Sequence, residues 1–241
     1  YSKGITSMSD LKQAIKQNYV KCAKDPSYFI NQYCTIQHPQ RGKIKFKLYP
    51  FQYDVLDEYQ SNDYNVILKS RQLGISTLSA AYSLWMMLFQ NDKNILVIAT
   101  TKDTAKNLIT KVRVMYEALP AWLKTAIVEN NKLSLVFKNG SQIKAIASNE
   151  SAGRSEALSL LILDEAAFIE KIDTIWTAAQ QTLATGGKCL AISTPNGVGN
   201  WFHKTWIDAT DEVNKFNTVK LHWSEHPERD EEWRKEQDRI L

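Results

Sequence analysis

Four short runs of aliphatic residues constrain the fold of this chain more strongly than any other feature. The runs lie at 65–69, 94–100, 159–164 and 188–193, and each is nearly continuous in apolar residues. Runs of this kind are typical of strands that are buried on both faces of a sheet. Longer amphipathic stretches with helical spacing separate them. The sequence therefore predicts an α/β fold with a mostly parallel central sheet flanked by helices.

Helical spacing and turn signals predict the elements around this sheet. Two short helices, at 9–24 and 26–34, are expected before a polar turn at 37–42. The dipeptide Asn139-Gly140 separates two further apolar runs and predicts a hairpin of the segments 133–138 and 142–147. The remaining helices are expected at 51–59, 75–90, 102–119, 171–183, 199–209 and 228–240.

Length and composition fit one sizeable core with small parts appended to it. The chain has 241 residues, of which 44% are hydrophobic. We expect a small helical N-terminal subdomain at 1–43, the α/β core at 44–212 and a linking C-terminal segment at 213–241. No apolar run approaches the roughly 20 residues that a membrane-spanning helix needs, and no secretory signal is visible. An intracellular location is therefore expected.

Cysteine spacing argues against a zinc site, and the net charge argues against a protein that wraps nucleic acid. Cys22, Cys34 and Cys189 lie far apart, without the paired spacing or the nearby histidines of a zinc site. We expect all three thiols to be reduced. The formal net charge of +4 suits contact with phosphates, but it falls short of the charge density of a protein that wraps nucleic acid.

The segment 69–77 has the context of a phosphate-binding loop, because it joins a predicted strand to a predicted helix. It departs from the usual pattern: Lys69 takes the place of the first glycine, and Ile75 takes the place of the lysine. Lys69 and Arg71 are the cations within the loop, and we favour Lys69 as the replacement. The nine residues are Lys69, Ser70, Arg71, Gln72, Leu73, Gly74, Ile75, Ser76 and Thr77.

Two residues of this loop have further predicted roles. Gly74 would let the backbone approach the phosphates, and the Ser76 hydroxyl would bind Mg²⁺. Arg71 would act as a second cation beside Lys69. Taken alone, a basic turn without any ligand explains the segment equally well.

The strand at 159–164 ends in two carboxylates, Asp164 and Glu165, as a Walker B strand does. Charged groups at the carboxyl end of a parallel strand lie where open α/β sheets bind ligands. Asp164 would hold Mg²⁺ through water, and Glu165 would orient and deprotonate the attacking water. The alternative is a pair of acidic residues that only cap the following helix. The strand at 94–100, between the two motifs, favours P-loop ATPases with a catalytic glutamate.

Three further signals are weaker. Ser193, Thr194 and Pro195 end another apolar strand, where hydroxyls could sense the γ-phosphate, although an ordinary turn explains them as well. A Tyr49 ring and a Gln52 amide could contact adenine, or simply begin a helix. Arg154, in a loop of small residues, could reach a phosphate as an arginine finger or be a solvated surface residue.

As an ordered set, these motifs resemble the ATPase domain of large terminases of tailed bacteriophages, especially the T4-like branch. Four segments carry the resemblance: 70–74, 153–154, 162–168 and 193–197. It implies a RecA-like P-loop NTPase fold of the catalytic-glutamate (ASCE) type, with Walker A at 69–77 and Walker B at Asp164. It also implies an adenine-contacting segment at 49–52, a catalytic Glu165, an arginine finger at Arg154 and a coupling motif at 193–195. Some terminases place the loop lysine first, as Lys69 is placed here.

The resemblance further implies an ATP hydrolase, using Mg²⁺ and ATP, that moves double-stranded DNA through the portal protein into a procapsid. Its partners would be the small terminase subunit and other copies of itself in a ring, typically of five, although the isolated domain could be a monomer. Its location would be the host cytoplasm at the portal vertex, and not the mature virion. Family members also carry an RNase H-like nuclease, which we expect to be absent because the chain ends at Leu241.

Two other functions remain open from the sequence. One is a helicase-like, DNA-remodelling ATPase, whose core motifs overlap with those of terminases. The other is a nucleotide-binding scaffold that does not hydrolyse ATP, in which Ile75 marks the lost activity.

Overall fold

The computed structural model of the protein describes residues 8–38, 40–148 and 157–240. Across these residues the main sheet has eight strands in the order β10-β3-β9-β8-β4-β7-β6-β5. Neighbouring strands are parallel from β10 to β7 and antiparallel from β7 to β5. The predicted α/β fold with a mostly parallel central sheet is therefore confirmed. The strands are β3 (Tyr64–Lys69), β4 (Asn94–Ala99), β5 (Ile127–Asn130), β6 (Ser134–Phe137), β7 (Gln142–Ala147), β8 (Leu160–Asp164), β9 (Lys188–Ser193) and β10 (Asn217–Leu221).

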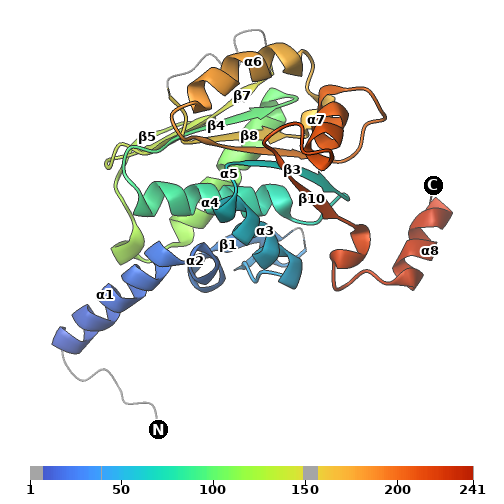
Figure 1. The fold of residues 1–241 in the computed structure, drawn as a ribbon. Coiled ribbons are helices and arrows are strands. Elements are labelled where there is room, and N and C mark those ends of the chain that lie inside the picture. The colour runs from blue at the N-terminus through green and yellow to red at the C-terminus, as the bar shows by residue number, and fades with distance from the viewer. Residues whose placement is uncertain (1–7, 39, 149–156, 241) are drawn as a thin grey trace.

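Helices cover both faces of this sheet (Figure 1). On one face lie α3 (Pro50–Ser61), α4 (Ile75–Phe89) and α5 (Lys102–Ala118), and on the other α6 (Ile172–Leu183) and α7 (Trp201–Thr210). Buried apolar side chains of the described residues form one cluster on each face: Ile67 of β3 belongs to the first, and its neighbour Val66 to the second. Successive side chains of a strand point to opposite faces, which explains why the central strands are continuously apolar.

The N-terminal part contains the two predicted helices, α1 (Met8–Lys24) and α2 (Pro26–Tyr33). The Asp25 carboxylate begins α2 by accepting hydrogen bonds from the backbone N–H groups of Ser27 and Tyr28. A small hairpin of β1 (Thr35–His38) and β2 (Gly42–Lys45) follows, where the sequence analysis predicts only a turn. Figure 1 shows α1 extending away from the sheet.

Two strands of the main sheet have no counterpart among the predicted elements. Strand β5 is an edge strand of the antiparallel end, and β10 is the opposite edge strand, paired in parallel with β3. Strand β10 lies within the segment 213–241, which also contains α8 (Glu231–Ile240). The division of the chain into 1–43, 44–212 and 213–241 stays a prediction.

The three cysteines, Cys22, Cys34 and Cys189, are free and buried, as the sequence analysis predicts for reduced thiols. Burial raises the pKa of the Cys22 thiol to about 11. In the part of the chain that the structure describes, no helix has both the length and the apolar character needed to cross a bilayer.

Candidate active site

The predicted site residues meet at the carboxyl ends of three neighbouring strands. The loop at the end of β3, the acidic residues at the end of β8 and the turn at the end of β9 all lie at the same edge of the sheet, where parallel sheets bind ligands. In the sheet, β9 separates β3 from β8, whereas β4 lies beyond β8. The strand that lies between the two motifs in the sheet is therefore β9, and not the strand predicted at 94–100, which is β4 and is one of four strands between them in sequence.

The loop 69–77 is bent by two residues in the left-handed region of backbone conformation, Gln72 (φ 60°) and Gly74 (φ 74°). Gly74 directly precedes α4, and no side chain caps that helix. The N–H groups of the first turn of α4 therefore face outward without intrahelical partners, together with the positive end of the helix dipole. This arrangement suits an anion such as a phosphate.

Gln52 of α3 holds this loop from beneath. Its amide Nε2 donates to the Leu73 carbonyl at 3.0 Å, and its Oε1 accepts from the Tyr49 backbone N–H at 3.0 Å. A Cβ atom added to Gly74 would lie 2.8 Å from Gln52 Nε2. The close approach and the positive φ both require glycine at position 74.

The three residues of the loop that bear on its missing lysine lie in different environments. Ile75 is 1% exposed and packs in the hydrophobic core, so it cannot reach a ligand. Arg71 is exposed. Lys69 is only 7% exposed, and its ammonium donates to Glu165 Oε1 at 3.0 Å. Within the loop, Lys69 is thus the cation that points into the site.

Asp164 and Ser76 form the second contact between the two motifs. The Ser76 hydroxyl donates to Asp164 Oδ1 at 3.0 Å. Burial raises the pKa of the Asp164 carboxyl, although the hydrogen bond from Ser76 opposes that rise. A hydroxyl and a carboxylate are oxygen ligands of the kind that Mg²⁺ prefers, and Mg²⁺ usually keeps several waters and binds substrate phosphates. The described residues contain no group of three or more His, Cys, Asp or Glu side chains that could hold a metal by themselves.

Glu165 has a left-handed backbone conformation (φ 55°, ψ 48°), which is uncommon for a residue other than glycine. Its Oε1 accepts from Lys69, and its Oε2 accepts from the backbone N–H and the hydroxyl of Thr194, each at 3.3 Å. Burial raises the pKa of this carboxyl, but the charge of Lys69 and these hydrogen bonds outweigh burial, so the pKa is lowered overall. Glu165 is therefore ionised at neutral pH, as a general base must be.

The turn after β9 is fastened to the segment that follows Glu165. The Ser193 hydroxyl accepts a hydrogen bond from the Ala167 N–H at 3.1 Å, and Asn196 Nδ2 donates to the Ala167 carbonyl at 3.0 Å. Ser193 and Thr194 are buried, whereas Pro195 is exposed. The structure thus brings two of the three predicted coupling residues against the predicted base.

A C-terminal contact of the loop was missed by the sequence analysis. The Arg229 guanidinium donates to the carbonyls of Arg71 (3.0 Å) and Gln72 (3.2 Å), and it lies 4.6 Å from the centre of the Trp233 ring. The ring of His226 is 4.7 Å from that of Tyr49. No sequence signal could have found these contacts with the loop and Tyr49. Arg229 and His226 lie more than a hundred residues after their partners, in a segment that contains no motif. Arg154, the predicted finger, lies outside the described residues.

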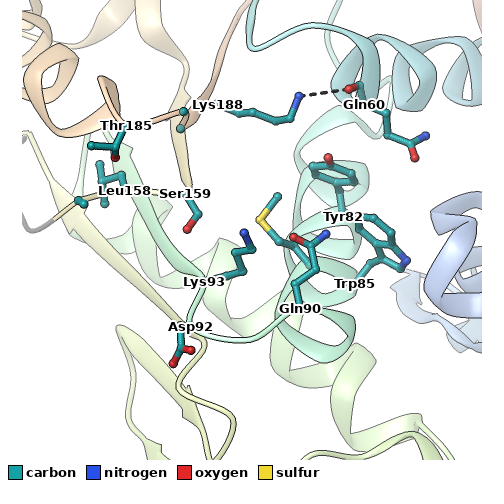
Figure 2. A pocket seen from close by; sticks show the side chains of 14 residues that line it. Gln60, Tyr82, Trp85, Gln90, Asp92, Lys93, Leu158, Ser159, Thr185 and Lys188 are labelled. Atoms are coloured by element: carbon teal, nitrogen blue, oxygen red, sulfur yellow. Dashed lines mark hydrogen bonds between the residues drawn. The ribbon is translucent and has the colours of Figure 1, made fainter.

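A separate hollow lies at the opposite edge of the sheet (Figure 2). It has a volume of about 480 Å³ and is lined by residues of α4 and by residues at the amino ends of β4, β8 and β9, among them Lys93, Ser159 and Lys188. Lys188 Nζ donates to the Gln60 carbonyl, which occupies one side of the hollow. Because these residues lie at the amino ends of the strands, the hollow is distinct from the candidate site.

Comparison with solved structures identifies the fold. The Thermus phage P74-26 large terminase ATPase domain matches with a TM-score of 0.63 and 23% identity, over 81% of this chain and 89% of that one. The HK97 bacteriophage large terminase matches with a TM-score of 0.65 and 20% identity, over 86% of this chain and 45% of that one. The UvsW helicase from bacteriophage T4 matches with a TM-score of 0.53 and 12% identity, over 82% of this chain and 67% of that one. At these identities the likeness shows the fold alone.

The family is shown by a match to the sequence model described as terminase large subunit, T4likevirus-type, N-terminal. That match covers residues 66–239, well over half of the chain. It includes the loop after β3, both acidic residues and the turn after β9. The predicted resemblance is confirmed: the chain belongs to the terminase large subunit family of the T4-like type, and it matches the N-terminal part of that family.

Proposed function

We propose that this chain hydrolyses ATP and that the reaction drives double-stranded DNA into a procapsid. One observation carries the first part of this proposal. The loop at the end of β3 and the acidic pair at the end of β8 meet through two hydrogen bonds of 3.0 Å. One joins Lys69 to Glu165, 96 residues later, and the other joins Ser76 to Asp164, 88 residues later. A basic turn without a ligand and a helix-capping acidic pair would not need to meet. An ATPase site does, because the metal and the water act on the same phosphate.

The phosphates would bind on the N–H groups of the loop and of the first turn of α4. Mg²⁺ would be held by the Ser76 hydroxyl and, through water, by Asp164, and it would neutralise charge on the phosphate oxygens. Lys69 can contribute as well, because an ammonium has three donors and its bond to Glu165 uses one of them. Tyr49 would contact the base from the start of α3, whereas Gln52, which is buried with both amide atoms hydrogen bonded, would hold the loop in place.

The hydrolytic step is assigned to Glu165. Its carboxylate would orient a water molecule and accept a proton from it as the water oxygen bonds to the γ-phosphorus. The bond from that phosphorus to the leaving oxygen of ADP would then break, and Lys69 would stabilise the developing charge, to which a Mg²⁺ ion held by Ser76 and Asp164 would add its own positive charge. Thr194, which binds Glu165 Oε2, would report the state of the site to the turn after β9. Arg154 would act as a finger, in its own subunit or in a neighbour.

The remaining parts of the proposal rest on the family. The chain would act at the portal vertex in the host cytoplasm, outside the mature virion, with the portal protein, the small terminase subunit and other copies in a ring. DNA would be contacted through its phosphates, so binding should weaken with salt and ignore sequence. One competing function is a DNA-remodelling ATPase, because the core motifs of such enzymes overlap with those of terminases. Strand separation on forked DNA, compared with movement along an intact duplex, distinguishes the two.

The test is release of phosphate from ATP by the wild type, Glu165→Gln and Glu170→Gln, with and without duplex DNA. Glu170 is exposed and close by in sequence, which makes it a matched control. We expect Glu165→Gln to lose about a hundredfold or more of the rate, as the loss of a general base usually does, while ATP still binds. We expect Glu170→Gln to keep its rate. A wild type that binds ATP and is as inactive as Glu165→Gln would instead establish the non-hydrolysing scaffold.

A further inference from the structure

A lysine outside every motif lies beside the candidate site. Lys111 belongs to α5, which packs against α4. Together with Thr77, the last residue of the loop, it lines a narrow hollow of about 120 Å³ between the two helices and the β1 hairpin. Thr77 directly follows Ser76, which binds Asp164. The side chain of Lys111 is therefore next to the first turn of α4, on the sheet face that carries α5.

Among the residues that the structure describes, none pairs directly with the charge of Lys111. Its side chain is half-buried, and among the described residues no carboxylate lies within ion-pair distance of its ammonium. Burial lowers the pKa of Lys111, while attraction to Asp164 opposes that change and repulsion from Lys69 adds to it. The ammonium is thus close enough to both residues to sense their charges. A partly buried cation without a fixed counter-ion is costly, unless an anion binds near it.

The charges of the site show which anion that would be. The Walker A position that usually supplies a cation holds Ile75, whose side chain lies in the core. Lys69 is hydrogen bonded to Glu165. Among the buried and half-buried charges of the site, the Lys69 and Lys111 ammonium groups balance the carboxylates of Asp164 and Glu165; without Lys111, these inner groups would sum to one negative charge. These inner groups would then repel a triphosphate. The other cations at the loop, Arg71 and Arg229, are an exposed side chain and a guanidinium bound to loop carbonyls.

We infer that Lys111 is a positioning residue of the nucleotide site: its ammonium supplies, from α5, a fixed positive charge that attracts the triphosphate and that Ile75 cannot supply. This inference rests on the proposed function. Lys111 acts through its charge across the first turn of α4, and it is assigned no step in the hydrolysis. The sequence analysis missed it because it lies 36 residues after Ile75, on a different helix.

The inference predicts effects of opposite sign on two ligands. A positive charge attracts a triphosphate and repels Mg²⁺. Removing it should therefore weaken the binding of metal-free ATP, and it should not weaken the binding of Mg²⁺ in the absence of ATP. For unit charges about 8 Å apart at an effective dielectric constant between roughly 20 and 40, the interaction corresponds to a factor of about five to thirty in affinity. A purely structural role of Lys111 would instead weaken both ligands together.

The experiment compares the wild type with Lys111→Met, Lys111→Arg and the control Lys106→Met. Lys106 is exposed on the same helix, so this control removes one charge from α5 without altering the hollow. Calorimetry measures the affinity for ATP in excess chelator, and thermal unfolding measures the concentration of Mg²⁺ alone that gives half-maximal stabilisation.

We expect Lys111→Met to bind ATP at least about fivefold more weakly, with an unchanged or lower half-maximal Mg²⁺ concentration. Lys111→Arg and Lys106→Met should resemble the wild type. Equal ATP affinities of Lys111→Met and Lys106→Met would overturn the inference, and so would parallel losses of ATP and Mg²⁺ binding. If Lys111→Met does not fold, a folded Lys111→Arg with lost ATP affinity would overturn it. If the wild type itself binds no ATP, the proposed function fails first.

Discussion

Replacing Lys69 by methionine removes the ammonium that donates to Glu165 Oε1, and the structure allows the cost to be estimated. At 3.0 Å, two unit charges attract by about 5.5 kcal/mol at an effective dielectric constant of roughly 20. Most of this attraction is offset by the free-energy cost of removing water from both charged groups on folding. A hydrogen bond between charged groups contributes about 1.5–3 kcal/mol to the free energy of unfolding, and we expect the coupling between Lys69 and Glu165 to fall in that range.

The two single substitutions, Lys69→Met and Glu165→Gln, should lower the unfolding free energy by different amounts. Lys69 is 7% exposed, whereas Glu165 is 32% exposed and keeps the hydrogen bonds from Thr194. Glu165→Gln therefore leaves an almost buried ammonium without its counter-ion, and Lys69→Met leaves a carboxylate that still has partners and water. We expect the first to lower the unfolding free energy more than the second.

The assay is a double-mutant cycle of wild type, Lys69→Met, Glu165→Gln and the double variant, unfolded in denaturant without nucleotide. The pair Lys188–Asp63, with 3.3 Å between Nζ and Oδ1, serves as the matched control because its aspartate is 67% exposed. Its coupling should stay below about 1 kcal/mol. A coupling below about 0.5 kcal/mol would mean that Lys69 and Glu165 do not stabilise each other in the folded protein, because it lies within the error of additivity.

Three other predictions concern the loop, its C-terminal contact and the thiols. Gly74→Ala should lose more stability than the control Gly42→Ala, which also has a positive φ but open space around its Cβ position; each incurs about 1–2 kcal/mol of backbone strain, and only the first displaces Gln52. Equal losses by chemical denaturation would contradict the contact. Arg229→Gln should speed amide hydrogen exchange at 223–229 and change the global unfolding free energy by less than about 1 kcal/mol, because it removes two hydrogen bonds to an exposed loop. Unchanged exchange would show that these bonds do not hold the segment. The three buried cysteines should resist a disulfide reagent at neutral pH until the protein unfolds, since burial raises the pKa of Cys22 to about 11 and leaves little thiolate. A fast-reacting thiol in the folded protein would contradict this.

The central strands could be predicted because each is buried on both faces, which forces a continuous apolar run. The edge strand β10 could not. Its first four residues alternate between partly buried and exposed, and only its last residue, Leu221, is buried, so the sequence contains no continuous apolar run. It becomes a strand because the edge of β3 offers parallel hydrogen bonds, which is a property of the assembled sheet.

The candidate site likewise contains residues whose positions could be predicted from the sequence and others whose positions could not. The positions of the loop and of the acidic pair follow from strands that end at one edge, so the meeting of Lys69 with Glu165 could be anticipated. Lys111 could not, because it lies beside the apolar stripe of α5 that includes Leu108 and Met115, where a lysine usually extends into solvent. Its position depends on how α5 packs against α4, which no local pattern encodes.

For this protein to act as an ATPase, the loop 69–77 must bind a nucleotide although Ile75 occupies the lysine position. Calorimetric titration of ATP with Mg²⁺ into the wild type and Lys69→Met tests it most directly. We expect saturable binding by the wild type, and binding at least about tenfold weaker in Lys69→Met. Absence of binding by the folded wild type, or equal affinity of the two proteins, would contradict the account.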